Sequence, residues 1–150
     1  MIQSFIDSLT ILTSNDSGVQ FQRDCIRGNS CDCWLCHNQG SANYNIVKEG
    51  IYEIDFNATV SSATAGVVAF QLFNNGEQIP GTLMAETLAA AGNYANIGIN
   101  KKIRVCCRAN ANISVRSVPL VADATDITAP AIETQTPIIA NANFSISRKA

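Results

Sequence analysis

The residues best suited to chemistry are concentrated in residues 23–40, RDCIRGNSCDCWLCHNQG. This stretch holds four of the six cysteines, the only histidine and the only tryptophan of the chain. Two thiolates spaced C-x-x-C can bind one tetrahedral zinc ion, and further thiolates or an imidazole can complete the ligand set. The candidate metal ligands are Cys25, Cys31, Cys33 and Cys36, with His37 as an alternative ligand.

Three states of these cysteines are open. A structural zinc is the first, although the second C-x-x-C pair that usually accompanies such a site is missing from the sequence. Disulfides within the stretch, to Cys106 or between protomers are the second, and unmodified thiols are the third. Because the stretch has few apolar residues, burial alone is too weak to order it, and we expect zinc or a disulfide to hold it in place. Trp34 is expected to anchor this stretch against the β-sandwich that the strand pattern predicts below, or against a neighbouring protomer.

Catalysis is not expected from these residues. His37 follows Cys36 directly, and this adjacency does not readily let the imidazole deprotonate the thiol. The sequence also contains no Gly-x-Ser-x-Gly elbow, phosphate-binding loop or dinucleotide fingerprint. We therefore expect a protein that is not an enzyme and that needs no cofactor, apart from a structural zinc if the first of the three cysteine states holds.

The composition of the chain limits the classes of partner that it is expected to bind. The chain has 150 residues, enough for a single domain with its own core, and 10 Lys and Arg residues balance 12 Asp and Glu residues. No basic run exceeds the Lys101-Lys102 pair, so we expect no nucleic-acid partner. A basic-flanked apolar leader and a run of about 18 apolar residues are both missing, which predicts no signal peptide and no membrane insertion.

The elements that must position the cysteines are predicted to be β-strands. Residues 51–61 alternate strictly between apolar and polar side chains, which is typical of a half-buried antiparallel strand. An Asn-Gly pair at residues 75–76 tolerates positive φ and predicts a tight hairpin after a strand at 67–73. Residues 84–93 are expected to be a surface excursion and residues 119–141 a long loop with at most one edge strand. Further strands are predicted at residues 96–108, 112–118 and 142–150. Eight to ten short strands with little helix indicate a sandwich or jelly roll.

Three sequence motifs and the C-terminal residues together resemble those of a known protein family. The motifs are G-x-Y-x-I-x-F from Gly50 to Phe56, F-x-L-x-x-N-G-x-x-I-x-G-T from Phe70 to Thr82, and the Cys106-Cys107 pair before an I-x-V strand. Together with the terminal NANFSISRKA, their order resembles the trimeric jelly roll of tumour necrosis factors, complement globular domains and the C-terminal domains of collagen-like exosporium proteins.

The resemblance implies an all-β, antiparallel, TNF-like jelly-roll domain over residues 44–150. Residues 1–43 would then be an N-terminal attachment segment with the Cys-rich loop. Within it, Ile2, Phe5, Ile6, Leu9 and Leu12 could form the apolar stripe of a short helix, whereas SLTILTS could equally pair as a strand.

The resemblance also implies a homotrimer displayed on a particle or cell surface. The cysteine pair is similar to the bacterial and phage branch, and the lack of a collagen stalk is similar to small virion proteins of Firmicutes phages. We therefore expect a virion structural protein made in the bacterial cytoplasm, such as a head fibre, capsid decoration or tail-tip module. Its partners would be other virion proteins of the capsid or tail, and possible contacts are host surface glycans. The alternative is a bacterial surface or spore-coat adhesion module of the same fold.

Overall fold

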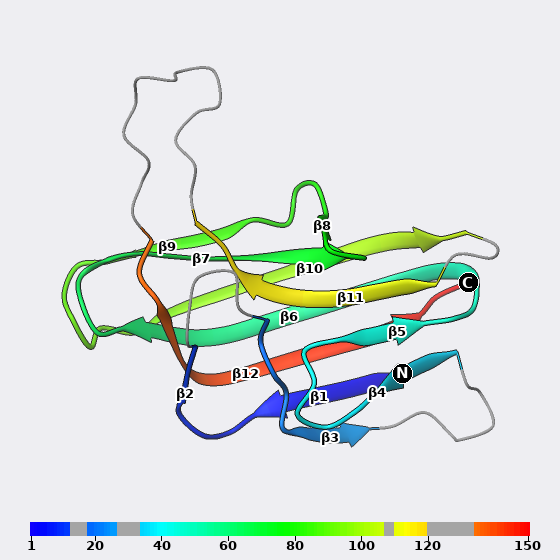
Figure 1. The fold of residues 1–150 in the computed structure, drawn as a ribbon, viewed down its shortest axis with the longest axis horizontal. Helices are drawn as coiled ribbons and strands as arrows, with labels where there is room; N and C mark the ends of the chain where they lie inside the picture. Colours follow the sequence, from blue (N-terminus) through cyan, green and yellow to red (C-terminus); the bar gives the residue numbers. More distant parts are fainter. Residues whose placement is uncertain (13–17, 27–33, 107–109, 120–133) are drawn as a thin grey trace, which may run out of the picture.

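A computed structural model describes residues 1–12, 18–26, 34–106, 110–119 and 134–150, without the side chains of residues 25 and 26. Every regular element in this part of the chain is a β-strand, and no helix in it is long and apolar enough to cross a membrane. The strands form two antiparallel sheets that pack face to face (Figure 1). The architecture is therefore the all-β antiparallel jelly-roll sandwich predicted from the sequence.

Sheet A holds the long strands. Its strands are, in spatial order, β10 (Ala95–Val105), β6 (Gly50–Ser62), β12 (Pro137–Arg148), β1 (Ile2–Ile6) and β3 (Arg23–Ile26), with β2 (Thr10–Ile11) pairing β12. Sheet B holds, in order, β4 (Leu35–His37), β5 (Tyr44–Ile46), β11 (Ala111–Ser117), β7 (Gly66–Asn74) and β8 (Glu77–Gln78), with β9 (Met84–Leu88) pairing β7.

Strand β6 confirms the period-two prediction. Its alternate residues face sheet B and are at most 4% exposed, whereas most of the residues between them lie on the outer face. The inward residues are Tyr52, Ile54, Phe56, Ala58 and Val60. The same rule places Phe144 and Ile146 of β12 in the core, as predicted. The core positions of β6 and of the end of β12 therefore follow from side-chain alternation, whereas the residues of β7 from Val68 to Phe73 are buried without alternating.

The hairpin prediction is also confirmed. Asn75 has φ of 53° and Gly76 has φ of 82°, and these two residues connect β7 to β8. Asparagine and glycine are the residues that tolerate this left-handed backbone most readily. The turn therefore determines where β7 ends and where the chain reverses.

Two segments differ from their predicted structure. Residues 84–88 are strand β9 instead of a surface excursion, because Met84 and Leu88 point into the core while β9 pairs with β7. Strand β12 begins at Pro137, inside the predicted loop, because Ile139 is fully buried and pairs with β6. Most of the rest of that predicted loop, residues 120–133, lies outside the described residues.

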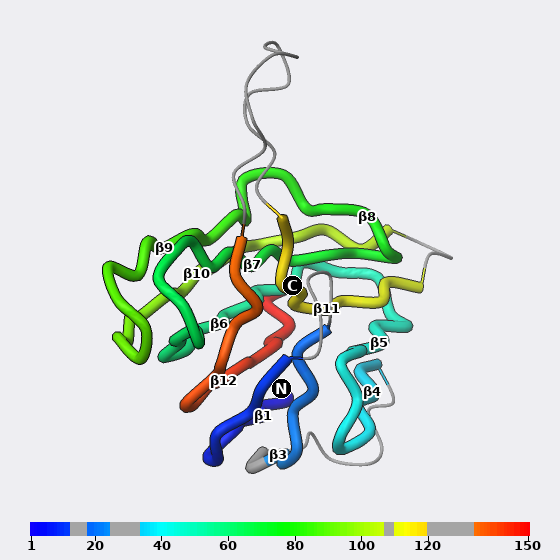
Figure 2. The backbone as a smooth tube through the Cα atoms, turned by 60° about the vertical axis from the view of Figure 1, so that its left-hand side comes forward, coloured from blue at the N-terminus to red at the C-terminus, as the bar shows by residue number. Residues whose placement is uncertain are grey.

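Residues on both sides of the expected boundary after residue 43 pack into the same two sheets. Strand β1 lies between β12 and β3, as Figure 2 shows, and Ile2 and Ile6 are at most 5% exposed. Val19 and Phe21 are fully buried, and β4 forms an edge of sheet B. The physical reason is that β1 pairs along β12 and buries apolar side chains that belong to the common core.

Candidate functional site

The predicted site residues come from the two edge strands β3 and β4. Strand β3 is the edge of sheet A and carries Asp24, whereas β4 is the edge of sheet B and carries His37. Asp24 Oδ1 lies 2.8 Å from His37 Nδ1, and both side chains have zero exposure. This buried pair therefore joins the edges of the two sheets, and both of its residues belong to the cysteine-rich stretch 23–40.

The second ring nitrogen of His37 and the carboxylate of Asp24 each make one further hydrogen bond. His37 Nε2 donates to the carbonyl oxygen of Ser41 at 3.0 Å, and Ser4 Oγ donates to Asp24 Oδ1 at 2.5 Å. Because a carbonyl oxygen only accepts, Nε2 must carry a proton. One further proton lies between Nδ1 and the carboxylate, so the pair is either an imidazolium with a carboxylate or two neutral groups. In both forms its net charge is zero, which lowers the cost of burial.

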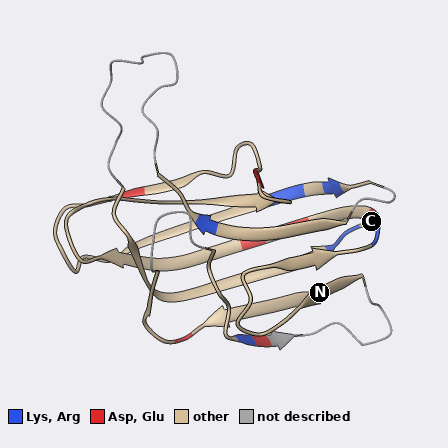
Figure 3. Ribbon diagram, in the orientation of Figure 1, with Lys and Arg blue, Asp and Glu red and all other residues tan. Residues whose placement is uncertain are grey.

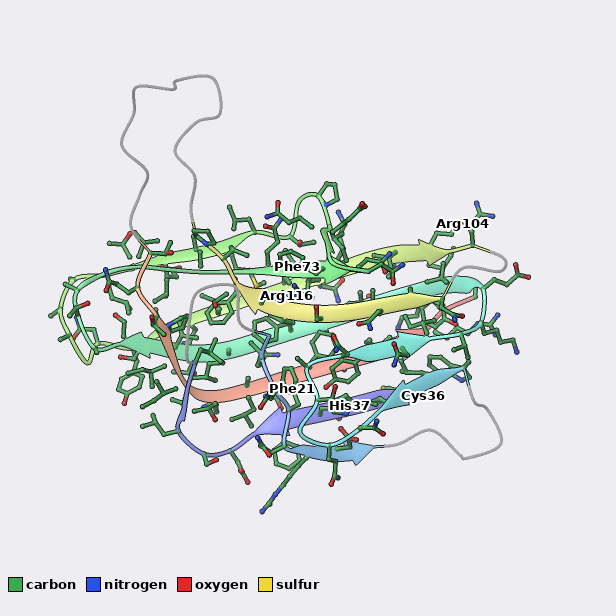
Figure 4. The ribbon with its side chains drawn as sticks, in the orientation of Figure 1. Phe21, Cys36, His37, Phe73, Arg104 and Arg116 are labelled. Carbon is green, nitrogen blue, oxygen red and sulfur yellow. The ribbon has the colours of Figure 1, made fainter. Side chains whose placement is uncertain are left out.

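Tyr44 packs on the imidazole. Its ring is stacked on His37, with 4.0 Å between ring centroids and 6° between the planes. The Tyr44 ring also packs against Phe144, whose ring centroid is 4.5 Å from that of Tyr44. Figure 4 labels His37 on β4 and Phe21 in the segment before β3, and both residues are buried. The imidazole is therefore held by packing as well as by hydrogen bonds.

Burial dominates the chemistry of the Tyr44 hydroxyl. Desolvation raises the pKa of Tyr44 far above its ordinary value, the neighbouring Ser4 hydroxyl lowers it and Asp24 raises it further. Within the described part of the chain, this buried hydroxyl makes no hydrogen bond of normal geometry, although it lies beside Ser4. Tyr44 is thus a neutral group that packs, and it does not act as an acid or base near neutral pH.

The arrangement contains the residue types of a hydrolase triad in an order that cannot activate a nucleophile. In a triad, the imidazole joins the carboxylate on one side to the hydroxyl on the other. Here the hydroxyl of Ser4 bonds to Asp24, and His37 Nε2 faces a backbone carbonyl. The side chains of Asp24 and His37 are also sealed from solvent. Their geometry is that of a structural clasp, which we call the Asp24–His37 clasp.

The predicted metal ligands are only partly visible in the described residues. Cys36 on β4 is exposed and free, and His37, its neighbour in the chain, points the other way into the sandwich. Both ring nitrogens of His37 are occupied, so His37 is not placed to serve as the alternative ligand. The side chain of Cys25 and the whole of Cys31 and Cys33 lie outside the described residues. Among the residues that are described, no three His, Cys, Asp or Glu side chains gather as a metal site.

Trp34 is an anchor, as the sequence predicts. Its ring lies 5.4 Å from that of Tyr52, and it packs against the main core. Its carbonyl oxygen accepts a hydrogen bond from the amide of Val47 at 2.9 Å. The chain therefore returns from the cysteine-rich stretch into sheet B through a well-packed residue.

Sequence analysis did not identify Asp24, Ser4 or Tyr44. Asp24 lies 13 residues before His37 and 20 residues after Ser4, and no local spacing links such positions. The one available signal was an acidic residue next to Cys25 within an otherwise sparse stretch. That signal is also typical of a solvated surface residue.

Comparison with known proteins supports the fold. Neither a protein-family model nor a curated protein sequence matches the chain. Among solved structures, the globular domain of the zebrafish complement 1qA protein matches with a TM-score of 0.65 and 7% identity, over 99% of this chain and 96% of that one. The structure of Eiger TNF from S. frugiperda matches with a TM-score of 0.60 and 10% identity, over 99% and 92%. The chain is thus a TNF/C1q-like jelly roll, and at these identities the likeness concerns the fold alone.

Proposed function

We propose that the protein is a non-enzymatic, homotrimeric structural protein of a phage virion, acting as a head fibre, capsid decoration or tail-tip module. The observation that carries the proposal is the outer face of sheet A, which is suited to contact with another copy of the chain. The TNF/C1q-like fold, together with the sequence motifs that resemble trimeric jelly rolls, supports the same assembly.

The middle of this outer face is a layer of short polar side chains. Asn143 Nδ2 donates to Asn57 Oδ1 at 3.4 Å, and Thr59 Oγ1 donates to Asn96 Oδ1 at 2.8 Å. Gly98 lies beside Asn57 in the register of β10 with β6 and adds no side chain. Short side chains that already bond to one another lose little rotamer entropy when a partner covers them. A partner can therefore cover this surface with only a small loss of side-chain conformational entropy.

One end of the same face is apolar. Ile11 of β2 pairs in register with Ile138 of β12, so these two isoleucines lie side by side. Ile11 is 65% exposed, and Tyr94, the residue before β10, is 62% exposed. Exposed apolar residues next to a polar face match the composition of an interface between subunits.

The mass of the purified protein in solution tests the assembly. Light scattering should give three times the 16.0 kDa mass of the chain. Replacing Ile11 by Asp should lower this mass, whereas Leu83→Asp should leave it unchanged, because Leu83 is 49% exposed and lies in the segment between β8 and β9. A monomer at micromolar concentration would contradict the homotrimer.

The virion assignment needs a separate test. Mass spectrometry of purified particles, together with labelling of the protein in electron micrographs, should find it on the head or tail. Capsid, portal or tail genes beside its gene would support the virion role. Sporulation or secretion genes in that place would instead favour the alternative, a bacterial surface or spore-coat adhesion module. Host surface glycans are the proposed contacts in the virion role.

A further inference from the structure

A hollow of about 620 Å³ opens at one end of sheet A. It lies where β10 and β12 end and β6 begins, so three segments that are distant in sequence line it. This volume is within the usual range for sites that bind small molecules. The lining residues that matter here are Glu49, Gly50, Ile51, Arg104 and Arg148.

Positive charge is concentrated around this hollow. Its lining holds two arginines and one glutamate, a local net charge of 2 − 1 = +1, while the whole chain carries −2. Lys48 and Lys149 are chain neighbours of lining residues, and Lys149 is bound to Glu53 at 2.6 Å. Figure 3 shows blue segments at this end of the sandwich, on β10 and close to the mark of the C-terminus, besides those on β11 and β3. Glu49 is the acidic side chain of the lining.

Arg148 is held in a fixed position on one side of the hollow. Its Nη2 donates to the carbonyl oxygen of Glu49 at 3.1 Å. It also acts on Tyr52: burial raises the pKa of that phenol, and the charge and hydrogen bond of Arg148 lower it. The guanidinium therefore needs little reordering when a ligand binds.

Gly50 makes this position of Arg148 possible. A Cβ atom at residue 50 would lie 2.8 Å from Arg148 Nε and 2.5 Å from the carbonyl oxygen of Ala150, both too close. The φ of Gly50 is +154°, a backbone conformation that favours glycine. The missing side chain thus lets the end of β12 pack against the start of β6.

Arg104 lines the hollow from β10, which pairs with β6 on the side away from β12. It lies near the end of β10, in register with Ile51, and its side chain makes no hydrogen bond or ion pair with any residue of the described ranges. Figure 4 shows its side chain directed away from the sandwich. Ile51 is 43% exposed beside it, which adds an apolar surface to a charged site.

We propose that this hollow binds one oxyanion, a carboxylate or phosphate group attached to a carbon skeleton. Arg148 would hold the anion in place, Arg104 would close on it with a second guanidinium, and Ile51 would contact the carbon skeleton. Guanidinium groups form paired, charge-assisted hydrogen bonds with both kinds of anion. Such groups occur on acidic sugars and on polyol phosphates of surface polymers. The site requires neither the virion role nor a trimer.

Isothermal titration at low ionic strength tests the site with two probes, sodium glucuronate for the carboxylate and glycerol 1-phosphate for the phosphate. At least one probe should bind saturably with one site per chain. Arg104→Gln should weaken that binding about tenfold or more, because one charge-assisted contact is lost. Glu49→Gln should strengthen it, since a negative charge of the lining is removed. The probe that binds more tightly identifies the source of the anion.

Arg23→Gln is the matched control. Arg23 is an exposed arginine of β3, away from the hollow, and should leave affinity unchanged. Thermal unfolding should show that Arg104→Gln folds like the original protein, because the described structure gives Arg104 no partner. Failure of both probes to bind saturably would overturn the proposal. Equal affinity of Arg104→Gln and the original protein would also overturn it.

Discussion

Asp24 and His37 connect the edge strand of one sheet to the edge strand of the other through a single contact of 2.8 Å. In the described residues, backbone hydrogen bonds do not join β3 to β4 directly. They do join the segments beside these strands, because the Gly40 amide donates to the Phe21 carbonyl oxygen at 2.8 Å and the Phe21 amide donates to the Ser41 carbonyl oxygen at 3.3 Å. The clasp therefore adds a buried side-chain link to these backbone contacts at the edge of the sandwich.

Removing one residue of the Asp24–His37 clasp should strongly lower the free energy of unfolding. We expect Asp24→Ala to lower the free energy of unfolding by about 3–5 kcal/mol, because His37 Nδ1 and the Ser4 hydroxyl lose their shared buried partner. Asp7→Ala should cost less than about 1 kcal/mol, because the Asp7–Arg23 pair is 53% and 65% exposed. Urea denaturation of both variants measures the difference. Equal losses would show that the buried pair adds no more than a surface pair.

Tyr44 should make the protein sensitive to alkali. Its folded-state pKa is raised above the ordinary value of 10.0, so the folded chain holds the phenolic proton more tightly than the unfolded chain. The resulting stability is fully present below about pH 10 and is lost as the pH rises above it. We expect Tyr44→Phe to lose less stability than the original protein between about pH 8 and pH 11. Tyr94→Phe is the control because Tyr94 is 62% exposed, and it should behave like the original protein.

Strand β1 should be needed for folding. Ile6 is 2% exposed, and Ile6→Ala should lower the free energy of unfolding by about 2–5 kcal/mol because it leaves a cavity in the core. Leu9, three residues later, is 62% exposed, and Leu9→Ala should change stability by less than about 0.5 kcal/mol. Chemical denaturation compares the two. A stable fold after loss of the Ile6 side chain would mean that β1 is a detachable segment.

The state of the cysteines can be decided by two measurements on the same sample. About one zinc per chain, in protein prepared without added zinc, would establish the predicted site of Cys25, Cys31, Cys33 and Cys36. Fewer than six reactive thiols under denaturing conditions, without metal, would establish disulfides, and six thiols without metal would exclude both.

Cys36→Ser provides a second test of the same stretch. We expect it to lower the melting temperature by a few degrees if Cys36 takes part in a cross-link, because the cross-link restricts the unfolded chain. Cys106→Ser should lower the melting temperature as well if the cross-link joins the stretch to Cys106, and it should leave that temperature unchanged if the cross-link lies within the stretch. Identical melting temperatures for Cys36→Ser and the original protein would argue for unmodified thiols.

The sequence by itself determined the faces of the strands and the main turn. Alternation over residues 51–61 assigned Tyr52 and Phe56 to the core, because successive side chains of a strand must point to opposite faces. The Asn75-Gly76 pair set the hairpin, because its backbone conformation is a local preference. These local signals predicted a sandwich or jelly roll, and the resemblance of the motif order to TNF-like domains selected the jelly roll.

Only the tertiary structure decided which strands lie side by side. The pairing of β1 with β12 joins Ile2 to Ile146, and the hollow joins Gly50, Arg104 and Arg148. The Asp24–His37 clasp likewise forms between strands of different sheets. A strand shows in its own residues which face is apolar, but it can pair with any strand of suitable length. The partner is selected by the burial and hydrogen bonding of the whole sandwich, so contacts between distant residues cannot be read from local spacing.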